Sequence, residues 1–186
     1  MKKIILLSLI ATGLSGCAGY TPRLNVDEKP AETDAFFYGR FHITTNKPVA
    51  ILDLSMDGYP SMGFGIKCND GAHYLLRFYK DNPVSVVKIK PSVCSLTEIV
   101  YSDTDGIVVG RKPFNKPFLQ NMQIKPGFAY YLGDFEAKMT YSSTYNKRTS
   151  EWQISNFRIN FGSTTLDMQS RYPNISKFAV ENMTRP

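Results

Sequence analysis

The stretch that decides the fold is GFGIKCNDGAHYLLRFY, residues 63–79. Two β-rich runs, residues 63–68 and 72–79, flank Asn69-Asp70-Gly71. These three residue types tolerate the positive φ that a tight turn between two strands requires. The glycines at the start of the stretch fit strand positions that a large neighbouring residue crosses. The stretch therefore predicts a β-hairpin.

Further runs of aromatic and β-branched residues extend this pattern in both directions. Turn residues separate them, such as Asp57-Gly58 and Lys125-Pro126-Gly127, the latter typical of a type II turn. We predict a mainly β fold, a single antiparallel β-sandwich of roughly nine or ten strands, because strands at this spacing favour a sandwich or barrel over βαβ units. The strands expected beyond the hairpin cover residues 36–45, 49–54, 84–89, 93–101, 107–109, 118–124, 128–135 and 152–161.

Three stretches depart from the simple strand pattern. Residues 111–117 contain two prolines, which cannot donate to a strand ladder, so we expect a loop or an edge strand. Residues 142–149 are polar and basic, which predicts an exposed connection. In the last run Ile154 and Phe157 fall on opposite parities, and a β-bulge near Ser155-Asn156 would absorb this slip.

Only the C-terminal segment, residues 164–186, has a helical pattern. Thr164 or Thr165 would cap a short helix that ends before Pro173. We expect another helical turn or two over residues 175–183, with Phe178 packing back on the sheet.

The N-terminus has the layout of a bacterial lipoprotein signal. Lys2 and Lys3 precede an apolar run over residues 4–11, which is too short to span a bilayer and fits a secretory signal. The signal, residues 1–16, leads to Leu14-Ser15-Gly16-Cys17, which resembles the bacterial lipobox. The resemblance implies cleavage before Cys17, acylation of its thiol and, because Ala18-Gly19 follows instead of an aspartate, export to the outer membrane. A chance cysteine after an ordinary signal peptide is the alternative.

Removal of the first 16 of the 186 residues leaves 170, enough for one domain with a core. Residues 17–34 contain few large apolar residues, which predicts a lipidated flexible tether before a sandwich domain over residues 35–163. Lys2 and Lys3 leave with the signal, so 20 basic and 16 acidic residues remain, a net charge of +4. This mild charge argues against nucleic acid and leaves a solvated basic face or attraction to an anionic surface.

Cys68 and Cys94 remain once Cys17 is lipidated. An even pair in an exported protein predicts a disulfide between them. Two buried free thiols are the alternative, since cysteine is a good small core residue. The oxidising compartment favours the disulfide, which would stabilise the fold by roughly 3–4 kcal/mol.

The sequence shows no pattern typical of a metal site. His42 and His73, even together with Cys68, lack a ligand pair at the short spacing of zinc sites. Asp103-Thr104-Asp105-Gly106 resembles the opening of a calcium loop. However, Phe114 stands where an EF-hand needs a bidentate glutamate, so a plain turn is expected. We expect no metal or cofactor.

Catalysis is disfavoured as well. There is no Gly-x-Ser-x-Gly elbow, phosphate-binding glycine loop or dinucleotide fingerprint. Glu98, Asp134 and Glu136 are candidate carboxylates, but the sequence does not place two of them face to face. We expect a protein without enzymatic activity; a hydrolase would need His42 or His73 beside a carboxylate in a cleft.

Tyrosines and basic residues gather in one part of the chain. Tyrosine beside a cation is typical of surfaces that bind proteins or glycans. The same residues also build sandwich cores, and their abundance there favours the core. The candidate interaction surface consists of Tyr131, Tyr141, Tyr145, Lys147 and Arg148.

The segment Ile124-Lys125-Pro126-Gly127, followed by Tyr130-Tyr131-Leu132, resembles stretches of uncharacterised bacterial envelope lipoproteins with prealbumin-like or immunoglobulin-like sandwiches. A transthyretin-like lipoprotein component of a secretion machine is the nearest specific version. The resemblance implies a non-catalytic interaction or assembly module of the outer membrane, facing the periplasm or the cell exterior, with an envelope protein as partner. A small-ligand or glycan-binding lipoprotein, with a concave aromatic pocket, is the alternative.

Overall fold

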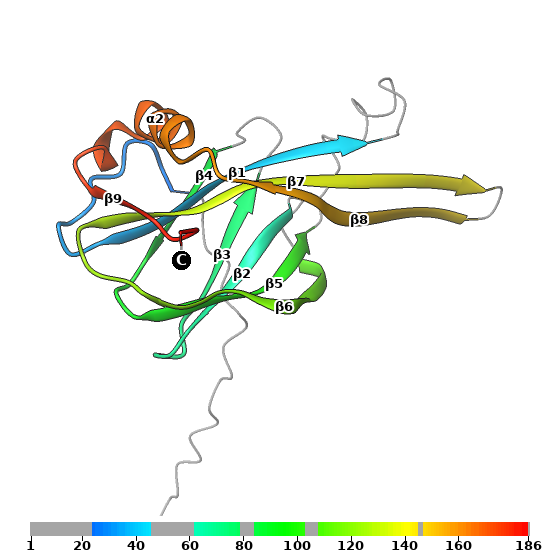
Figure 1. Cartoon of the computed structure of the whole chain (residues 1–186), viewed down its shortest axis with the longest axis horizontal. Coiled ribbons are helices and arrows are strands. Elements are labelled where there is room, and N and C mark those ends of the chain that lie inside the picture. Colours follow the sequence, from blue (N-terminus) through cyan, green and yellow to red (C-terminus); the bar gives the residue numbers. More distant parts are fainter. Residues whose placement is uncertain (1–23, 46–61, 79–83, 103–107, 145–146, 186) are drawn as a thin grey trace, which may run out of the picture.

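The computed structural model describes residues 24–45, 62–78, 84–102, 108–144 and 147–185. This part of the chain is mainly β, with nine strands in two sheets, one α-helix and a short 3-10 helix (Figure 1). The strand expected over residues 49–54 lies outside the described residues. The elements are β1 (Ala35–Thr45), β2 (Met62–Cys68), β3 (His73–Phe78), β4 (Val84–Ile89), β5 (Val93–Ser102), β6 (Val108–Gln123), β7 (Phe128–Thr144), β8 (Lys147–Arg158), α2 (Phe161–Arg171), η1 (Pro173–Ile175) and β9 (Ala179–Asn182).

The five-stranded sheet has the order β4-β1-β7-β8, with β9 also beside β7, and the four-stranded sheet has the order β3-β2-β5-β6. β1 and β9 run parallel to β7, whereas the other described pairings are antiparallel. The prediction of an all-antiparallel fold is therefore wrong for the five-stranded sheet, which is mixed. The whole four-stranded sheet separates β1 from β7 along the chain, so no hairpin turn fixes their relative direction.

The two sheets face each other across the main core. Phe64 of β2 lies at its centre and meets the ring of Phe78 of β3 edge to face, with the centroids 5.4 Å apart. It also contacts Phe135 of β7 across the sheets, at 4.5 Å. Such aromatic pairs add to the free energy gained from burial of their area. The predominance of phenylalanine in the strands is thus explained by one shared core between the sheets.

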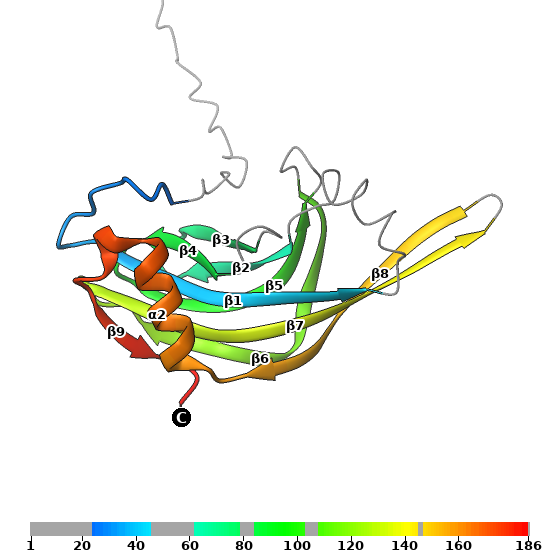
Figure 2. The ribbon, with the colours of Figure 1, turned by 90° about the horizontal axis from the view of Figure 1, so that it is seen from above.

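The other face of the five-stranded sheet carries a second, smaller core beneath α2 (Figure 2). Phe36 and Tyr38 of β1 belong to this side, whereas Phe37 between them belongs to the main core. The ring of Phe178 meets that of Phe36 edge to face at 5.0 Å, which confirms the predicted packing of Phe178 on the sheet. Because this sheet is buried on both faces, three consecutive aromatic residues of β1 are all excluded from water.

Residues 24–34 are held against the body of the domain at several points, so the prediction of a flexible tether is wrong for this part of the segment. Leu24 is only 7% exposed and lies among the residues of that core. The side chain of Asn174 donates a hydrogen bond to the backbone of the segment at 3.0 Å. Glu28 accepts a hydrogen bond from Lys88 of β4, and this bond raises the pKa of the Lys88 ammonium. The composition concealed this packing because the leucine is isolated in sequence and finds its apolar neighbours only in the fold.

The predicted hairpin is present as β2 and β3, joined by the Asn69-Asp70-Gly71 turn. Gly71 adopts φ +84°, and the Cys68 N–H donates to the Ala72 carbonyl at 2.9 Å. Cys68 also lies directly opposite Cys94 of β5. These two residues form the predicted disulfide, and both are buried in the main core.

β7 and β8 form one long hairpin that projects from the body of the molecule (Figures 1 and 2). Residues 142–149, expected as an exposed connection, are mostly strand, and the pairing continues to Thr144 opposite Lys147. The expectation was wrong because strands are recognised by apolar alternation, and this end of the hairpin has a polar sequence.

The β-bulge predicted near Ser155-Asn156 is confirmed. Glu136 pairs with Asn156 and Ala137 pairs with Ile154, which leaves Ser155 as the extra residue. The extra residue shifts the alternation of side chains between the two faces by one position. Ile154 and Phe157 therefore face the same side and both pack against the main core.

Residues 111–117 lie within β6, which is the edge strand of the four-stranded sheet, one of the two expected placements. The runs over residues 107–109 and 118–124, expected as separate strands, overlap with the same long strand. Its register with β5 shifts at three places. The prolines are tolerated there because an edge strand has one side that needs no ladder hydrogen bonds.

α2 begins at Phe161 with Asn160 as the N-cap residue, so the prediction of a helix capped by Thr164 or Thr165 is wrong. Both threonines lie inside the helix and are buried. Their hydroxyls mimic a capping signal in the sequence, but in the fold they bind groups of the sheet. The helix ends before Pro173, as expected.

The C-terminal segment after α2 is not helical beyond η1. Residues 179–182 form β9, which pairs in parallel with residues 128–131 of β7. β8 pairs with β7 only from Asp134 onward, so β9 fills the part of that edge which β8 leaves open. The boundary expected at residue 163 is therefore wrong, because the last strand belongs to the sheet.

Removal of the disulfide tests its contribution to stability. The double variant Cys68→Ala/Cys94→Ala should unfold with a free energy lower by about 3 kcal/mol, because the unfolded chain regains the entropy of an open loop. We expect a fall in melting temperature of about 10 °C, measured by circular dichroism. Reductant should not affect the variant further, and an unchanged melting temperature would contradict the prediction.

Candidate functional site

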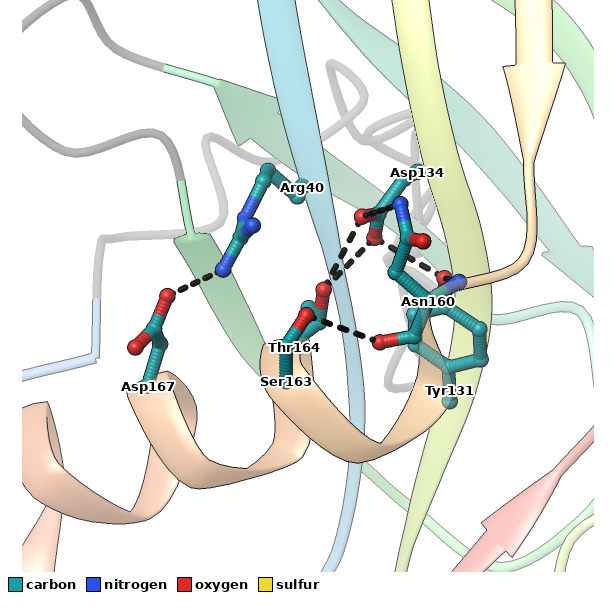
Figure 3. A network of polar contacts seen from close by, with 7 residues as sticks. All are labelled: Arg40, Tyr131, Asp134, Asn160, Ser163, Thr164 and Asp167. Carbon is teal, nitrogen blue, oxygen red and sulfur yellow. Dashed lines mark hydrogen bonds and ion pairs between the residues drawn. The ribbon is translucent and has the colours of Figure 1, made fainter.

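The carboxylate of Asp134 is the centre of a buried polar network between β7 and α2 (Figure 3). The hydroxyl of Thr164 donates to both carboxylate oxygens, at 2.8 and 3.0 Å. The Tyr131 hydroxyl donates at 2.8 Å, and the Asn160 side-chain amide donates at 3.0 Å. Hydrogen bonds of this kind to a charged acceptor are among the stronger ones in proteins.

A β-bulge in β7 brings this carboxylate under the helix. Tyr38 pairs with Tyr131 and Arg40 pairs with Asp134, so Leu132 and Gly133 together stand opposite the single residue between the two β1 positions. Gly133 has φ +120°, which L side chains rarely adopt. The extra residue reverses the parity of β7. Tyr131 and Asp134 therefore face the same side of the sheet, although they are three residues apart.

Two tyrosines join the network from neighbouring strands. The hydroxyls of Tyr38 and Thr165 are hydrogen-bonded at 2.6 Å, and Tyr131 accepts a hydrogen bond from the Asn160 backbone N–H at 3.1 Å. Burial raises the pKa of Tyr38 to about 12. Burial, together with the nearby Asp134 carboxylate, also raises the pKa of Tyr131. Both phenols thus stay protonated at neutral pH, which allows Tyr131 to remain a donor.

The outer rim of the network is weaker. Arg40 forms an ion pair with Asp167 of α2, and the Asp167 side chain is 58% exposed. The Ser163 hydroxyl donates to the Asn160 carbonyl at 3.3 Å near the start of the helix. Exposed pairs of this kind stabilise a fold by less than about 1 kcal/mol. The main polar attachment of α2 to the sheet is therefore the Asp134 cluster beneath the helix.

This arrangement is suited to holding the helix in place. Donors from β7, from the residue before α2 and from α2 itself satisfy the Asp134 carboxylate, and all of them come from within the chain. A carboxylate satisfied in this way binds β7 to the first turn of α2, which lies 26–30 positions later in the sequence. The sequence pointed to Asp134 only as a candidate carboxylate. An isolated glycine inside an apolar strand, here Gly133, is the signal that would have indicated the bulge.

The structure separates the other candidate residues. His42 lies exposed on β1 and His73 lies exposed on β3, in different sheets. Cys68 is consumed by the disulfide. Glu98 pairs with Arg111 on the four-stranded sheet, and Glu136 pairs with Arg158 at 3.0 Å on the other sheet. Within the described ranges no group of three or more potential metal ligands is present.

Two candidate regions lie outside the described residues. These are the calcium-like loop at residues 103–106 and the signal and lipobox up to Cys17. In the part of the chain that the structure describes, no helix has the length and apolarity needed to cross a bilayer.

The candidate tyrosine surface is divided by the fold. Tyr131 is fully buried in the second core, so its assignment to an interaction surface is wrong. Tyr131 is buried because it lies in a sheet that is covered on both faces. Tyr141 stands opposite Ser150, and Arg148 stands opposite Ser143, in the projecting hairpin of β7 and β8. Lys147 stands at the end of the same hairpin, and Tyr145 lies outside the described residues.

The outer part of this hairpin is a two-stranded ribbon, which we define as residues 140–144 and 147–151. Within the described residues, pairing of β7 with β1 reaches Met139 opposite Thr45, whereas pairing with β8 continues to Thr144 opposite Lys147. Figures 1 and 2 show the ribbon pointing away from residues 24–34, η1 and β9, which lie at the other end of the molecule. A two-stranded ribbon is only marginally stable by itself in water.

No protein-family model matches the chain, and no curated protein matches its sequence. A leucine-rich repeat protein from Bacteroides thetaiotaomicron VPI-5482 shows a distant structural likeness, with a TM-score of 0.31, 11% identity and coverage of 60% of this chain and 12% of that chain. A candidate cell adhesion protein from Bacteroides fragilis NCTC 9343 has a TM-score of 0.21 and 9% identity, over 70% of this chain and 47% of that chain. The chain thus spans less than half the length of either, and such low TM-scores carry neither fold nor function over to it.

Substitution of the bulge glycine should destabilise the protein. A Cβ added at Gly133 would collide with the Phe157 ring. The substituted residue would also have to keep φ +120°, which is unfavourable for L side chains. Gly133→Ala should therefore lower the free energy of unfolding by about 2–4 kcal/mol. Urea titration followed by circular dichroism measures this change.

Gly162→Ala is the matched control, because an added Cβ at this α2 position meets nothing within 4 Å. Alanine is the better helix former, so stability should stay the same or rise by up to about 1 kcal/mol. Equal effects of the two substitutions would contradict the role of the bulge.

Removal of the buried carboxylate should loosen α2. Asp134→Ala leaves the donors of Tyr131, Asn160 and Thr164 without their acceptor, so we expect a loss of about 3 kcal/mol in unfolding free energy. Asp167→Ala, which removes only the exposed ion pair, should cost less than about 1 kcal/mol. Denaturant titration of both variants tests the difference, and a smaller loss for Asp134→Ala would refute the central place of this carboxylate.

Proposed function

We propose that this protein is an outer-membrane lipoprotein, anchored through Cys17, whose β domain is a non-catalytic interaction or assembly module of the bacterial envelope. The observation that carries the proposal is the polar ribbon of β7 and β8, which projects from the end of the domain opposite the packed N-terminal segment (Figures 1 and 2). A strand ribbon with unpaired edges offers backbone hydrogen bonds to another polypeptide.

The packing of residues 24–34 supports an orientation for this module. Leu24 is buried, so only seven residue steps separate the body of the domain from a lipid on Cys17. Even fully extended, such a segment reaches about 25 Å. The anchor would thus keep the α2 side near the membrane, and the ribbon would extend toward the periplasm or the cell exterior.

The architecture is consistent with this role. We interpret the two sheets and their shared core as a β-sandwich of the prealbumin-like or immunoglobulin-like kind, although its larger sheet is mixed. The most specific form of this proposal is that the protein is a component of a secretion machine. A glycan-binding role would need exposed aromatic residues, and Tyr130 and Tyr131, buried in the cores, do not supply them.

The anchor is tested by Cys17→Ser. This variant lacks the thiol that is alkylated, so we expect it in the soluble fraction after cell lysis without detergent. The wild-type protein should sediment with the membranes. Retention of the variant in the membrane fraction would refute the lipid anchor.

The assembly role is tested by shortening the hairpin, with residues 140–151 replaced by an Asn-Gly turn that suits a two-residue hairpin loop. We expect the detergent-solubilised lipoprotein to run in native electrophoresis as an assembly larger than one chain. The shortened variant should run as a monomer with an unchanged circular dichroism spectrum. Asp70→Ala in the turn at the other hairpin is the matched control, and an assembly that survives the shortening would overturn the proposal.

A further inference from the structure

The edges of the two sheets are not equally open to a further strand. On β6 the residues Pro113 and Pro117 lack an N–H, and the register with β5 is interrupted three times. β4 is short, contacts β3, and is held by residues 24–34 through Lys88, which pairs with Glu28. Such features block edge-to-edge pairing.

β8 has none of these protections along most of its length. It contains no proline, its one bulge lies at Ser155 near the body, and it ends the strand order of its sheet among the described residues. Among the described residues, the outer part of β7 is the one strand that pairs with it in the ribbon. A two-stranded ribbon is marginal by itself in water, so further strands paired with it would add stability.

The sequence of β8 in the ribbon is complementary to itself. If Thr149 lies on a twofold axis, antiparallel pairing with a second copy sets Lys147 of each copy directly opposite Glu151 of the other. The symmetry thus gives two pairs of opposite charge. With Glu151 on the axis, the two glutamates would oppose each other, and pairing along the whole of β8 would oppose Lys147 to Arg158. Of these three registers, only the one centred on Thr149, which is confined to the ribbon, sets opposite charges against each other.

We propose that the partner of the ribbon is a second copy of this chain. The two ribbons pair through β8 around Thr149 and form a four-stranded antiparallel sheet in the order β7-β8-β8-β7. The ribbons project from their domains, so this pairing lets the two bodies lie on opposite sides of the new sheet (Figure 2). The inference deepens the proposed assembly function and rests on it, but the pairing itself does not depend on the lipid.

The test uses the mature chain with Cys17→Ser, studied by sedimentation equilibrium without detergent. We expect a monomer–dimer equilibrium. Glu151→Lys should raise the dimer dissociation constant at least tenfold, because it opposes like charges twice, and Lys147→Glu/Glu151→Lys should restore it. Glu32→Lys, an exposed charge reversal outside the ribbon, is the control and should leave the constant unchanged.

A cross-link tests the register. Thr149→Cys should give a covalent dimer on mild oxidation, since the two copies of residue 149 face each other on the axis, whereas Gln153→Cys should not. A chain that stays monomeric at all concentrations, a double charge reversal that fails to restore pairing, or equal cross-linking at both positions would overturn the inference. If the protein is monomeric while the native envelope assembly is still lost on hairpin shortening, the ribbon binds another protein and only the proposed function stands.

Discussion

The arrangement of this fold depends on one backbone irregularity, the β-bulge at Leu132 and Gly133 in β7. Before the bulge the even-numbered residues of β7 face the main core, and after it the odd-numbered residues do so. Without this reversal, the Asp134 carboxylate would face the apolar main core and Phe135 would face α2. A charged group without partners in such a core costs several kcal/mol, so the bulge is what makes the sequence of β7 compatible with a sheet buried on both faces.

The bulge also marks the place where the chain exchanges neighbours along one edge of β7. β9 pairs with the residues before it, and β8 pairs with the residues after it. Between these pairings the chain leaves β8, and Asn160 donates its backbone N–H to the Tyr131 hydroxyl. After β9, the Met183 N–H donates to the Tyr131 carbonyl. The strand exchange, the reversal of parity and the polar network are therefore parts of one construction around Tyr131.

Features set by local residue chemistry could be predicted from the sequence. Turn propensity predicts the turn at Asn69-Asp70-Gly71, the even cysteine pair predicts the disulfide of Cys68 with Cys94, and parity predicts the bulge at Ser155. All three are present. The parallel pairing of β1 with β7, the strand character of β9 and the burial of Leu24 could not be predicted. Each depends on a surface formed by residues far away in the chain. For the same reason Thr164 looked like a helix cap, since the carboxylate that its hydroxyl binds lies 30 positions earlier in the sequence.

The two ends of the long hairpin differ in the apolar packing and in the neighbouring strands that support them. Near the body, Phe135 of β7 and Phe157 of β8 pack with ring centroids 5.1 Å apart, and β1 supports the sheet as far as Met139. Beyond that point the strands have a polar sequence and lack a third strand among the described residues. The packed base fixes the direction in which the ribbon leaves the domain, so less conformational entropy is lost when a further strand pairs with it. The ribbon is held by a packed base, and its β8 edge has no proline and no further strand beside it among the described residues. It thus combines a defined geometry with an edge open to pairing, and this combination is what a strand-mediated assembly requires.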